Sequence, residues 1–129
     1  MSVVADHMTR DLVTVAPDEL LGSAAVRMAE RKVGAALILD GNRLIGILSE
    51  RDVLRAVAAG GAESAPVSAW MTANPETIES DDSLDQAAVL MIHGGFRHLP
   101  VVDGGRAVGI LSIRDLVRVA LDDRAPRGA

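Results

Sequence analysis

The sequence predicts an α+β fold made of two copies of one unit, each with the order strand, helix, strand, strand, helix. The first observation is a gapless internal repeat, in which the stretch 46–52 returns as 109–115. The second is that each copy holds two short apolar runs around an Asp-Gly turn, followed by a helix with one apolar face. A period this long that occurs only twice indicates duplication, because a solenoid needs three or more units. We expect the two units to pack sheet to sheet around a pseudo-two-fold axis.

The first unit opens with a short β-prone segment, residues 12–15, which ends before Pro17. A helix is predicted over about 18–32, because four apolar or small side chains recur at the spacing of one helical face. These side chains are Leu21, Ala24, Ala25 and Met28. The basic residues Arg31 and Lys32 near the end of this helix are interpreted as part of a solvated face.

A β-hairpin and a second helix complete the first unit. The hairpin strands are predicted at residues 35–39 and 43–48, two apolar runs of strand length. Asp40-Gly41-Asn42 forms the turn, since these residue types tolerate positive φ. The second helix is predicted to begin at Ser49 and to end near Gly60.

The second unit repeats this order. A strand is predicted at residues 76–79 and a helix over about 80–93. The hairpin strands are predicted at 99–102 and 106–111, and the last helix at about 113–121. We therefore expect a first unit at residues 1–62, a second unit at 63–121 and a flexible C-terminal tail at 122–129.

The composition excludes several classes of function. The net charge of −5 and the presence of only two aromatic residues argue against nucleic acid as the main partner. No apolar run approaches the roughly 20 residues that a membrane span needs, and no signal peptide is visible. The lack of cysteine fits a reducing compartment, so we expect a cytoplasmic protein. No nucleophile–base pair, pair of acid–base carboxylates or metal-binding cluster can be read, so we expect neither an enzyme nor a metal site.

Each hairpin runs into a helix through the pattern Ser-x-Arg-Asp. Ser49 and Asp52 form it in the first unit, and Ser112 and Asp115 form it in the second. One interpretation is a capping box, in which the Ser and the acidic residue each satisfy a free backbone amide of the helix start. The alternative is an anion-binding site, since the free amides and the dipole of a helix N-terminus both favour phosphate.

Two further features favour the anion-binding interpretation. Gly46 and Gly109 lie inside the preceding strands, where glycine costs stability and often marks the close approach of a backbone or a ligand. Arg51 and Arg114 lie directly before the two aspartates, and each guanidinium could pair with a phosphate. A carboxylate for ribose hydroxyls beside a hydroxyl and an arginine for phosphate is the chemistry that a nucleoside phosphate requires.

The duplicated unit resembles the CBS domain, the regulatory module first associated with cystathionine β-synthase, which occurs in tandem pairs. The resemblance covers about Val3 to Arg118. It is carried by the two Ser-x-Arg-Asp junctions and by three further segments: Met8-Thr9, Met71-Thr72 and Leu99-Pro100-Val101-Val102-Asp103. It implies two clefts between the units that bind adenosine compounds, with the aspartate on the ribose and the serine and arginine on the phosphate.

The resemblance assigns a set of residues to each cleft. One cleft takes Ser49, Arg51 and Asp52, and the other takes Ser112, Arg114, Asp115, Arg97 and His98. Arg97 and His98 precede the second hairpin, at positions where the first unit has Gly34 and Ala35. This difference implies that the cleft of the first unit keeps Ser49 and Asp52 but lacks the extra cation, and that it binds an anionic ligand less well. The adenine is expected beside residues 10–12 and 73–75.

The resemblance also implies a function. We expect a regulatory module without a required cofactor that binds AMP, ADP or ATP, while S-adenosylmethionine and NAD are further ligands to consider. We expect a homodimer that signals to a separate protein. The alternative is a ligand-independent scaffold for dimerisation or partner binding, in which the junctions are ordinary helix caps.

Overall fold

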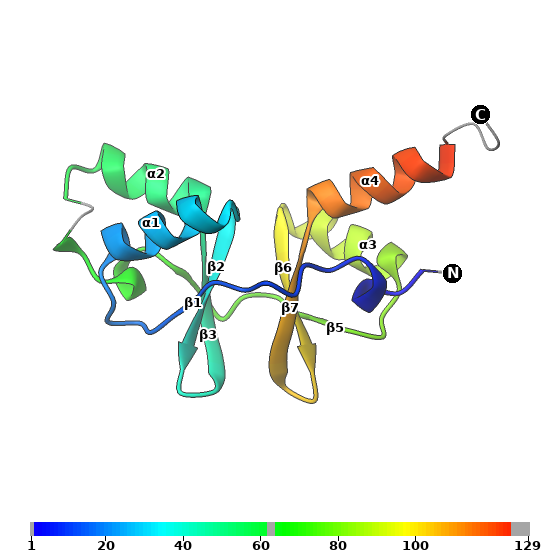
Figure 1. The fold of residues 1–129 in the computed structure, drawn as a ribbon, viewed down its shortest axis with the longest axis horizontal. Helices are drawn as coiled ribbons and strands as arrows, with labels where there is room; N and C mark the ends of the chain where they lie inside the picture. The colour runs from blue at the N-terminus through cyan, green and yellow to red at the C-terminus, as the bar shows by residue number, and fades with distance from the viewer. Residues whose placement is uncertain (1, 62–63, 125–129) are drawn as a thin grey trace.

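The computed structural model describes residues 2–61 and 64–124 and shows the expected duplicated α+β architecture (Figure 1). The helices are α1 (Leu21–Arg31), α2 (Glu50–Ala58), α3 (Leu84–Gly94) and α4 (Ile113–Arg124). The strands are β1 (Thr14–Val15), β2 (Ala35–Asp40), β3 (Arg43–Ser49), β4 (Thr72–Ala73), β5 (Ile78–Glu79), β6 (His98–Asp103) and β7 (Arg106–Ser112). Two short 3₁₀ turns, Val4–Asp6 and Val67–Ala69, precede the units. The predicted fold class is confirmed.

Each half is built on an antiparallel hairpin. β2 pairs with β3 from Ala35↔Ser49 to Asp40↔Arg43, and β6 pairs with β7 in the equivalent register. A short parallel strand flanks each hairpin, β1 beside β2 and β5 beside β6. The hairpin turns point to one end of the molecule, and the helices lie towards the other end in two pairs, α1 with α2 and α3 with α4 (Figure 1).

The two sheets are buried on both faces. In each half, one face packs on its two helices and forms a core around fully buried residues such as Leu48 or Leu111. The opposite faces meet between the halves through a smaller cluster: Ala35, Leu37, Ile47 and Ile110. The continuous apolar runs of the hairpins are explained by this burial on two sides.

The halves exchange the segments that precede their first strands (Figure 1). Val4 is buried in the core of the second half, and the backbone of Thr9 pairs with that of Ile110 in both directions, at 2.8 and 2.9 Å. Val67 is buried in the first half, and β4 pairs with β3. The expected sequence units, 1–62 and 63–121, therefore each send their first residues into the other half.

Several element boundaries differ from the prediction for local reasons. α1 begins at Leu21, because residues 16–19 form a turn in which Glu19 Oε1 accepts the Ala16 amide at 3.1 Å. α3 begins after Ser83, which forms a capping box with Gln86, and not near Ser80. α4 continues to Arg124, so the first part of the expected tail is helical, and residues 125–129 lie outside the described residues. β4 was not predicted.

Within residues 2–61 and 64–124, none of the helices combines the length and the apolar character that crossing a bilayer requires.

Candidate functional site

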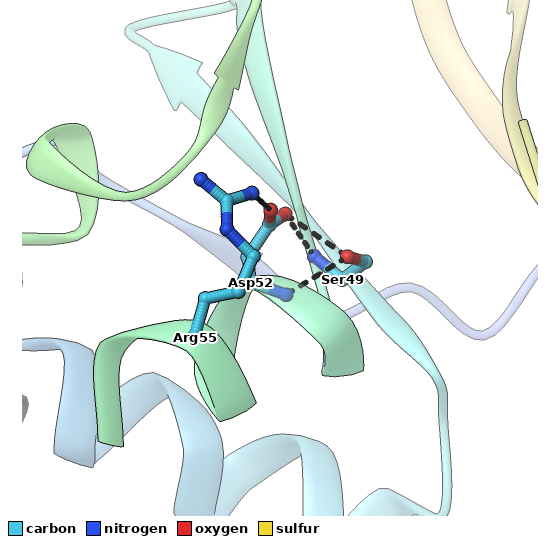
Figure 2. A network of polar contacts seen from close by, with 3 residues as sticks. All are labelled: Ser49, Asp52 and Arg55. Atoms are coloured by element: carbon cyan, nitrogen blue, oxygen red, sulfur yellow. Dashed lines mark hydrogen bonds and ion pairs between the residues drawn. The ribbon is translucent and has the colours of Figure 1, made fainter. Parts of the chain in front are cut away.

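The two hairpin–helix junctions are capping boxes with almost the same geometry. In the first, Asp52 Oδ2 accepts the Ser49 amide at 2.9 Å and the Ser49 hydroxyl at 3.0 Å, while Ser49 Oγ accepts the Asp52 amide at 3.2 Å (Figure 2). In the second, the corresponding distances at Ser112 and Asp115 are 2.8, 3.0 and 3.2 Å. The capping interpretation is therefore correct for both junctions, and it commits one carboxylate oxygen of each aspartate.

The second oxygen of each aspartate faces an arginine three residues later. Arg55 Nη1 donates to Asp52 Oδ1 at 3.1 Å, as Figure 2 shows, and the Arg55 guanidinium lies 6.0 Å from the centre of the Trp70 ring. Arg118 Nη1 lies 3.6 Å from Asp115 Oδ1, too far for a hydrogen bond. Oδ1 of Asp115 is therefore more available to accept a hydrogen bond than Oδ1 of Asp52.

The larger of two clefts lies beside the second junction, and we call it the Ser112 cleft. Its volume is about 580 Å³, which is in the range of small-molecule sites. Both sequence units contribute to its wall: the first gives Thr9, Asp11, Arg31, Lys32, Gly34 and Glu50, and the second gives Arg97, His98, Ser112, Arg114, Asp115 and Arg118. The cleft therefore exists only because the two units pack together.

The smaller cleft, which we call the Ser49 cleft, lies beside the first junction and has a volume of about 290 Å³. Its polar wall residues are Ser49, Glu50, Arg51, Asp52, Arg55, Thr72, Glu76, Arg97 and His98. All eight residues of the expected ligand site line the two clefts. Each junction's Ser, Arg and Asp line the cleft of that junction alone, whereas Arg97 and His98 line both clefts. Parts of the segments expected near the adenine, Asp11 and Pro75, also line a cleft each.

One expectation about the clefts is wrong. Arg97 and His98 line the Ser49 cleft as well as the Ser112 cleft, so the first junction does not lack their cation. The reason is that the segment before β6 lies where the two halves meet. The interpretation of Arg31 and Lys32 as a merely solvated face is also incomplete, since both line the Ser112 cleft.

The clefts still differ in charge, for another reason than expected. Five basic side chains and three carboxylates line the Ser112 cleft, whereas three of each line the Ser49 cleft. Two of the basic side chains are in ion pairs inside the Ser112 cleft: Arg31 with Asp11 and Arg118 with Asp115. Within the described residues, Lys32, Arg97 and Arg114 form no ion pair. All three of these residues line the Ser112 cleft.

The surroundings of His98 shift the pKa of its imidazole. Burial lowers the pKa of His98 below the ordinary value of 6.5, and the positive charges of Arg114 and Arg97 act in the same direction. The carboxylates of Glu50 and Asp115 oppose this shift in pKa. The imidazole is therefore mostly neutral at pH 7 and can serve as either a donor or an acceptor in the clefts.

The strand glycines serve the exchanged segments and not a ligand. A Cβ on Gly46 would lie 2.4 Å from Met71 Sδ and 3.2 Å from the Thr72 carbonyl oxygen. A Cβ on Gly109 would lie 2.5 Å from Met8 Sδ and 3.0 Å from the Thr9 carbonyl oxygen. Of the two causes that a strand glycine suggests, the structure selects the close approach of another backbone.

Comparison with known proteins gives a family and a fold. The family model described as "CBS domain" matches twice, at residues 4–59 and 67–122. The chain is 37% identical over 117 residues to the CBS domain-containing protein YhcV of Bacillus subtilis, a match that covers 90% of this chain and 84% of YhcV. It is 42% identical over 104 residues to CBSCBSPB5 of Arabidopsis thaliana, where the match covers 78% of this chain but only 19% of the plant protein.

Solved structures of similar chains share the whole fold. The CBS-domain protein ATU1752 of Agrobacterium tumefaciens is 38% identical with a TM-score of 0.85, and the match covers 92% of this chain and 99% of that one. PAE2072 of Pyrobaculum aerophilum, solved with AMP, is 30% identical with a TM-score of 0.86 over 95% and 97% of the two chains. The CBS pair of MJ0100, solved with 5′-methylthioadenosine and S-adenosyl-L-methionine, is 25% identical with a TM-score of 0.88 over 95% and 98%.

Proposed function

We propose that this chain, which belongs to the CBS-domain family as a tandem pair, is a regulatory module that binds an adenine nucleotide in the Ser112 cleft. The ligand is AMP, ADP or ATP, and its binding is passed on to a separate partner protein. The observation that carries the proposal is a set of three cations, Lys32, Arg97 and Arg114, that form no ion pair within the described residues. They lie next to Asp115, whose Oδ1 is 3.6 Å from Arg118 and accepts no hydrogen bond from it.

The contacts of a nucleotide follow from the groups that the cleft offers. Asp115 Oδ2 is committed to the cap, so Oδ1 is the acceptor for a ribose hydroxyl. Arg97 and Arg114 offer planar donors that suit phosphate oxygens, and Lys32 adds a point charge. Backbone groups of residues 10–12, around Asp11 in the cleft wall, are suited to hydrogen-bond with the adenine edge.

The similar structures support an adenosine ligand. PAE2072 was solved with AMP, and so was CBSX2, which is 30% identical to this chain with a TM-score of 0.82. MJ0100 was solved with two compounds that contain adenosine but no phosphate. The positive charge of the Ser112 cleft favours the phosphate-bearing members of this ligand set here.

Isothermal titration calorimetry with AMP, ADP, ATP and adenosine tests the proposal. Arg114→Glu should weaken AMP binding in the Ser112 cleft by about tenfold or more, because a charge-assisted contact is replaced by repulsion. Arg43→Glu is the matched control, since Arg43 is exposed in the first hairpin and lines neither cleft. If the wild-type protein gives neither heat nor a thermal shift at millimolar nucleotide, the proposal fails.

A second candidate function, a dimerisation or partner-binding scaffold, is favoured by the exposed apolar residues of the helices. Leu54 on α2 and Ile92 on α3 are 68% and 74% exposed. Further exposed apolar side chains lie on all four helices: Val26, Val57, Val89, Ile113, Val117 and Leu121. We propose that this surface joins two copies of the chain into a homodimer. Dimerisation that persists while no nucleotide binds would favour the scaffold over the sensor.

A further inference from the structure

We propose that the two clefts are antagonistic sites, so that a phosphate-bearing ligand in one cleft lowers the affinity of the other. The inference rests on the proposed function and concerns how its two sites are linked. Its basis is that Glu50, Arg97 and His98, which we call the shared wall, line both clefts. No other residue lines both clefts among those that the structure describes.

The shared wall is a tightly packed contact between the two units. A Cβ on Gly34 would lie 2.7 Å from Glu50 Oε1 and 3.0 Å from His98 Nε2. The first unit thus brings Glu50 and the second brings His98 to the same point. Glycine at position 34 is what allows both side chains to lie this close to the backbone of the first unit.

Backbone hydrogen bonds fix the wall to both helix starts. The Glu50 amide, at the start of α2, donates to the Gly34 carbonyl at 3.0 Å. The Ile113 amide, at the start of α4, donates to the Arg97 carbonyl at 2.8 Å. A change at the second junction therefore acts on the segment that carries Arg97 and His98. A change at the first junction acts on Gly34, beside which the His98 ring lies.

The repeat shows why one wall serves two sites. The positions of Arg97 and His98 are occupied by Gly34 and Ala35 in the first unit. The position of Glu50 is occupied by Ile113 in the second unit. If the two units were identical at these positions, each cleft would have its own copy of these polar residues. In this chain one set, Glu50, Arg97 and His98, lies between the two units and lines both clefts.

The charges set the sign of the coupling. One guanidinium forms a bidentate pair with one phosphate, so a ligand that holds Arg97 deprives the other cleft of its cation. The Ser49 cleft has no surplus of positive charge and depends on Arg97 more than the Ser112 cleft does. Two phosphates on either side of a thin wall also repel each other, which adds to the antagonism.

Titration of AMP into variants in which one cleft is closed tests the coupling. Arg114 lines only the Ser112 cleft and Arg51 lines only the Ser49 cleft, and both side chains are exposed at equivalent positions of the repeat. Arg114→Glu and Arg51→Glu thus each close one cleft to anions and replace no residue of the shared wall. Because the charge at position 114 also acts on His98, the comparison is repeated with His98→Gln in the wild type and in the variant alike. Calorimetry then gives the affinity of the remaining cleft in isolation.

We expect the Ser49 cleft of Arg114→Glu to bind AMP at least about fivefold more tightly than the weaker step of the wild-type protein. If the wild type binds a single AMP, each variant should also bind one, at its open cleft. When both proteins also carry Arg97→Gln, this difference in AMP affinity should nearly disappear, because the cation that both clefts share has been removed. Adenosine, which has no phosphate, should show a much smaller difference.

The proposal is overturned if the affinity of the Ser49 cleft agrees within twofold in the wild type and Arg114→Glu. It is equally overturned if Arg114→Glu binds no AMP, or if it still takes two AMP with unchanged constants. Failure of the proposed function would look different, because then neither the wild type nor any variant would bind AMP, ADP or ATP.

Discussion

Asp52 and Asp115 each serve the fold before they serve a ligand. They are 4% and 8% exposed, and the hydrogen bonds of the caps use Oδ2 of both. A ribose must therefore compete for Oδ1, where Arg55 is a close donor in the first junction and Arg118 a distant one in the second. Substituting either aspartate confounds binding with folding, so the neighbouring arginines are better probes of the clefts.

The caps predict a stability effect that is separate from ligand binding. Ser49→Ala and Ser112→Ala should each lower the free energy of unfolding by about 1 kcal/mol, since each removes the acceptor of one helix-start amide. Urea denaturation without ligand measures this change. Equal losses at the two sites are expected from their matching geometry, and the absence of any loss at both would contradict the assigned capping role.

His98 predicts a pH dependence of binding. Burial lowers its pKa below 6.5, and a phosphate in either cleft should raise this pKa, because the dianion favours the imidazolium. Affinity for AMP should therefore rise as the pH falls from about 7.5 through the pKa of the complex, and level off below the lower pKa of the free protein. Calorimetry in buffers of different ionisation enthalpy should show proton uptake on binding.

The groups that face His98 define the control for this dependence. The charges of Glu50, Asp115, Arg114 and Arg97 act on the pKa of His98, and all four groups are unchanged in a His98 variant. His98→Gln should thus remove most of the proton uptake between pH 6 and 7.5 with AMP. The AMP phosphate itself titrates near pH 6, so the difference between the wild type and His98→Gln is the quantity that matters. If the wild type and His98→Gln take up the same number of protons, the assignment of this pH dependence to His98 is refuted.

At the scale of the elements, the strand glycines tie the hairpins to the exchanged segments. Gly46→Ala and Gly109→Ala should each destabilise the fold by about 1–3 kcal/mol, because the added methyl meets a methionine side chain and a backbone carbonyl. Gly61→Ala is the control, since a Cβ there meets nothing within 4 Å. Thermal unfolding of the three variants tests this, and a glycine pair as tolerant as Gly61 would contradict the assigned close approach.

The sequence predicted the long elements well and the short ones poorly. Hairpins and helices carry periodic patterns over many residues, and the repeat allowed each copy to support the other. β4 has two residues, too few for any period, and its partner β3 is distant in the chain. The start of α1 was placed early because the acidic residues at 18–19 resemble a first turn but form a preceding one.

The sequence predicted correctly only those features of the site that belong to the repeated motif. Ser49, Asp52, Ser112 and Asp115 follow from a local motif that occurs twice. Which cleft Arg97 enters depends on how the two halves pack, and no local pattern contains that information. The pairing of Arg55 and Arg118 with the aspartates could have been predicted from the sequence. Each arginine lies three residues after an aspartate of the motif, on the same helical face.

At the scale of the whole molecule, the clefts exist because two half-domains share one interface. The exchanged segments and the inter-sheet cluster hold the halves in a fixed relation, which sets the width of both clefts. The exposed apolar side chains belong to the four helices, and Figure 1 shows the helices towards the end of the molecule opposite to the hairpin turns. This arrangement separates the surface proposed for dimerisation from the tips of the hairpins.

The helical surface predicts an assembly change on charge insertion. Ile92→Glu should shift the protein from dimer to monomer, because a carboxylate would be buried without a partner in the interface. Arg43→Glu, the same new side chain at a hairpin position, should leave the mass unchanged. Light scattering after size exclusion measures both variants. A wild-type protein that is already monomeric at high micromolar concentration would contradict the proposed homodimer.

The most direct test of the central claim is a crystal structure of the protein grown with AMP. The account predicts AMP in the Ser112 cleft, with a ribose hydroxyl on Asp115 Oδ1 and the phosphate within reach of Arg97, Arg114 and Lys32. A Ser112 cleft that holds no nucleotide at saturating AMP, or one closed by side chains from its own walls, would contradict it.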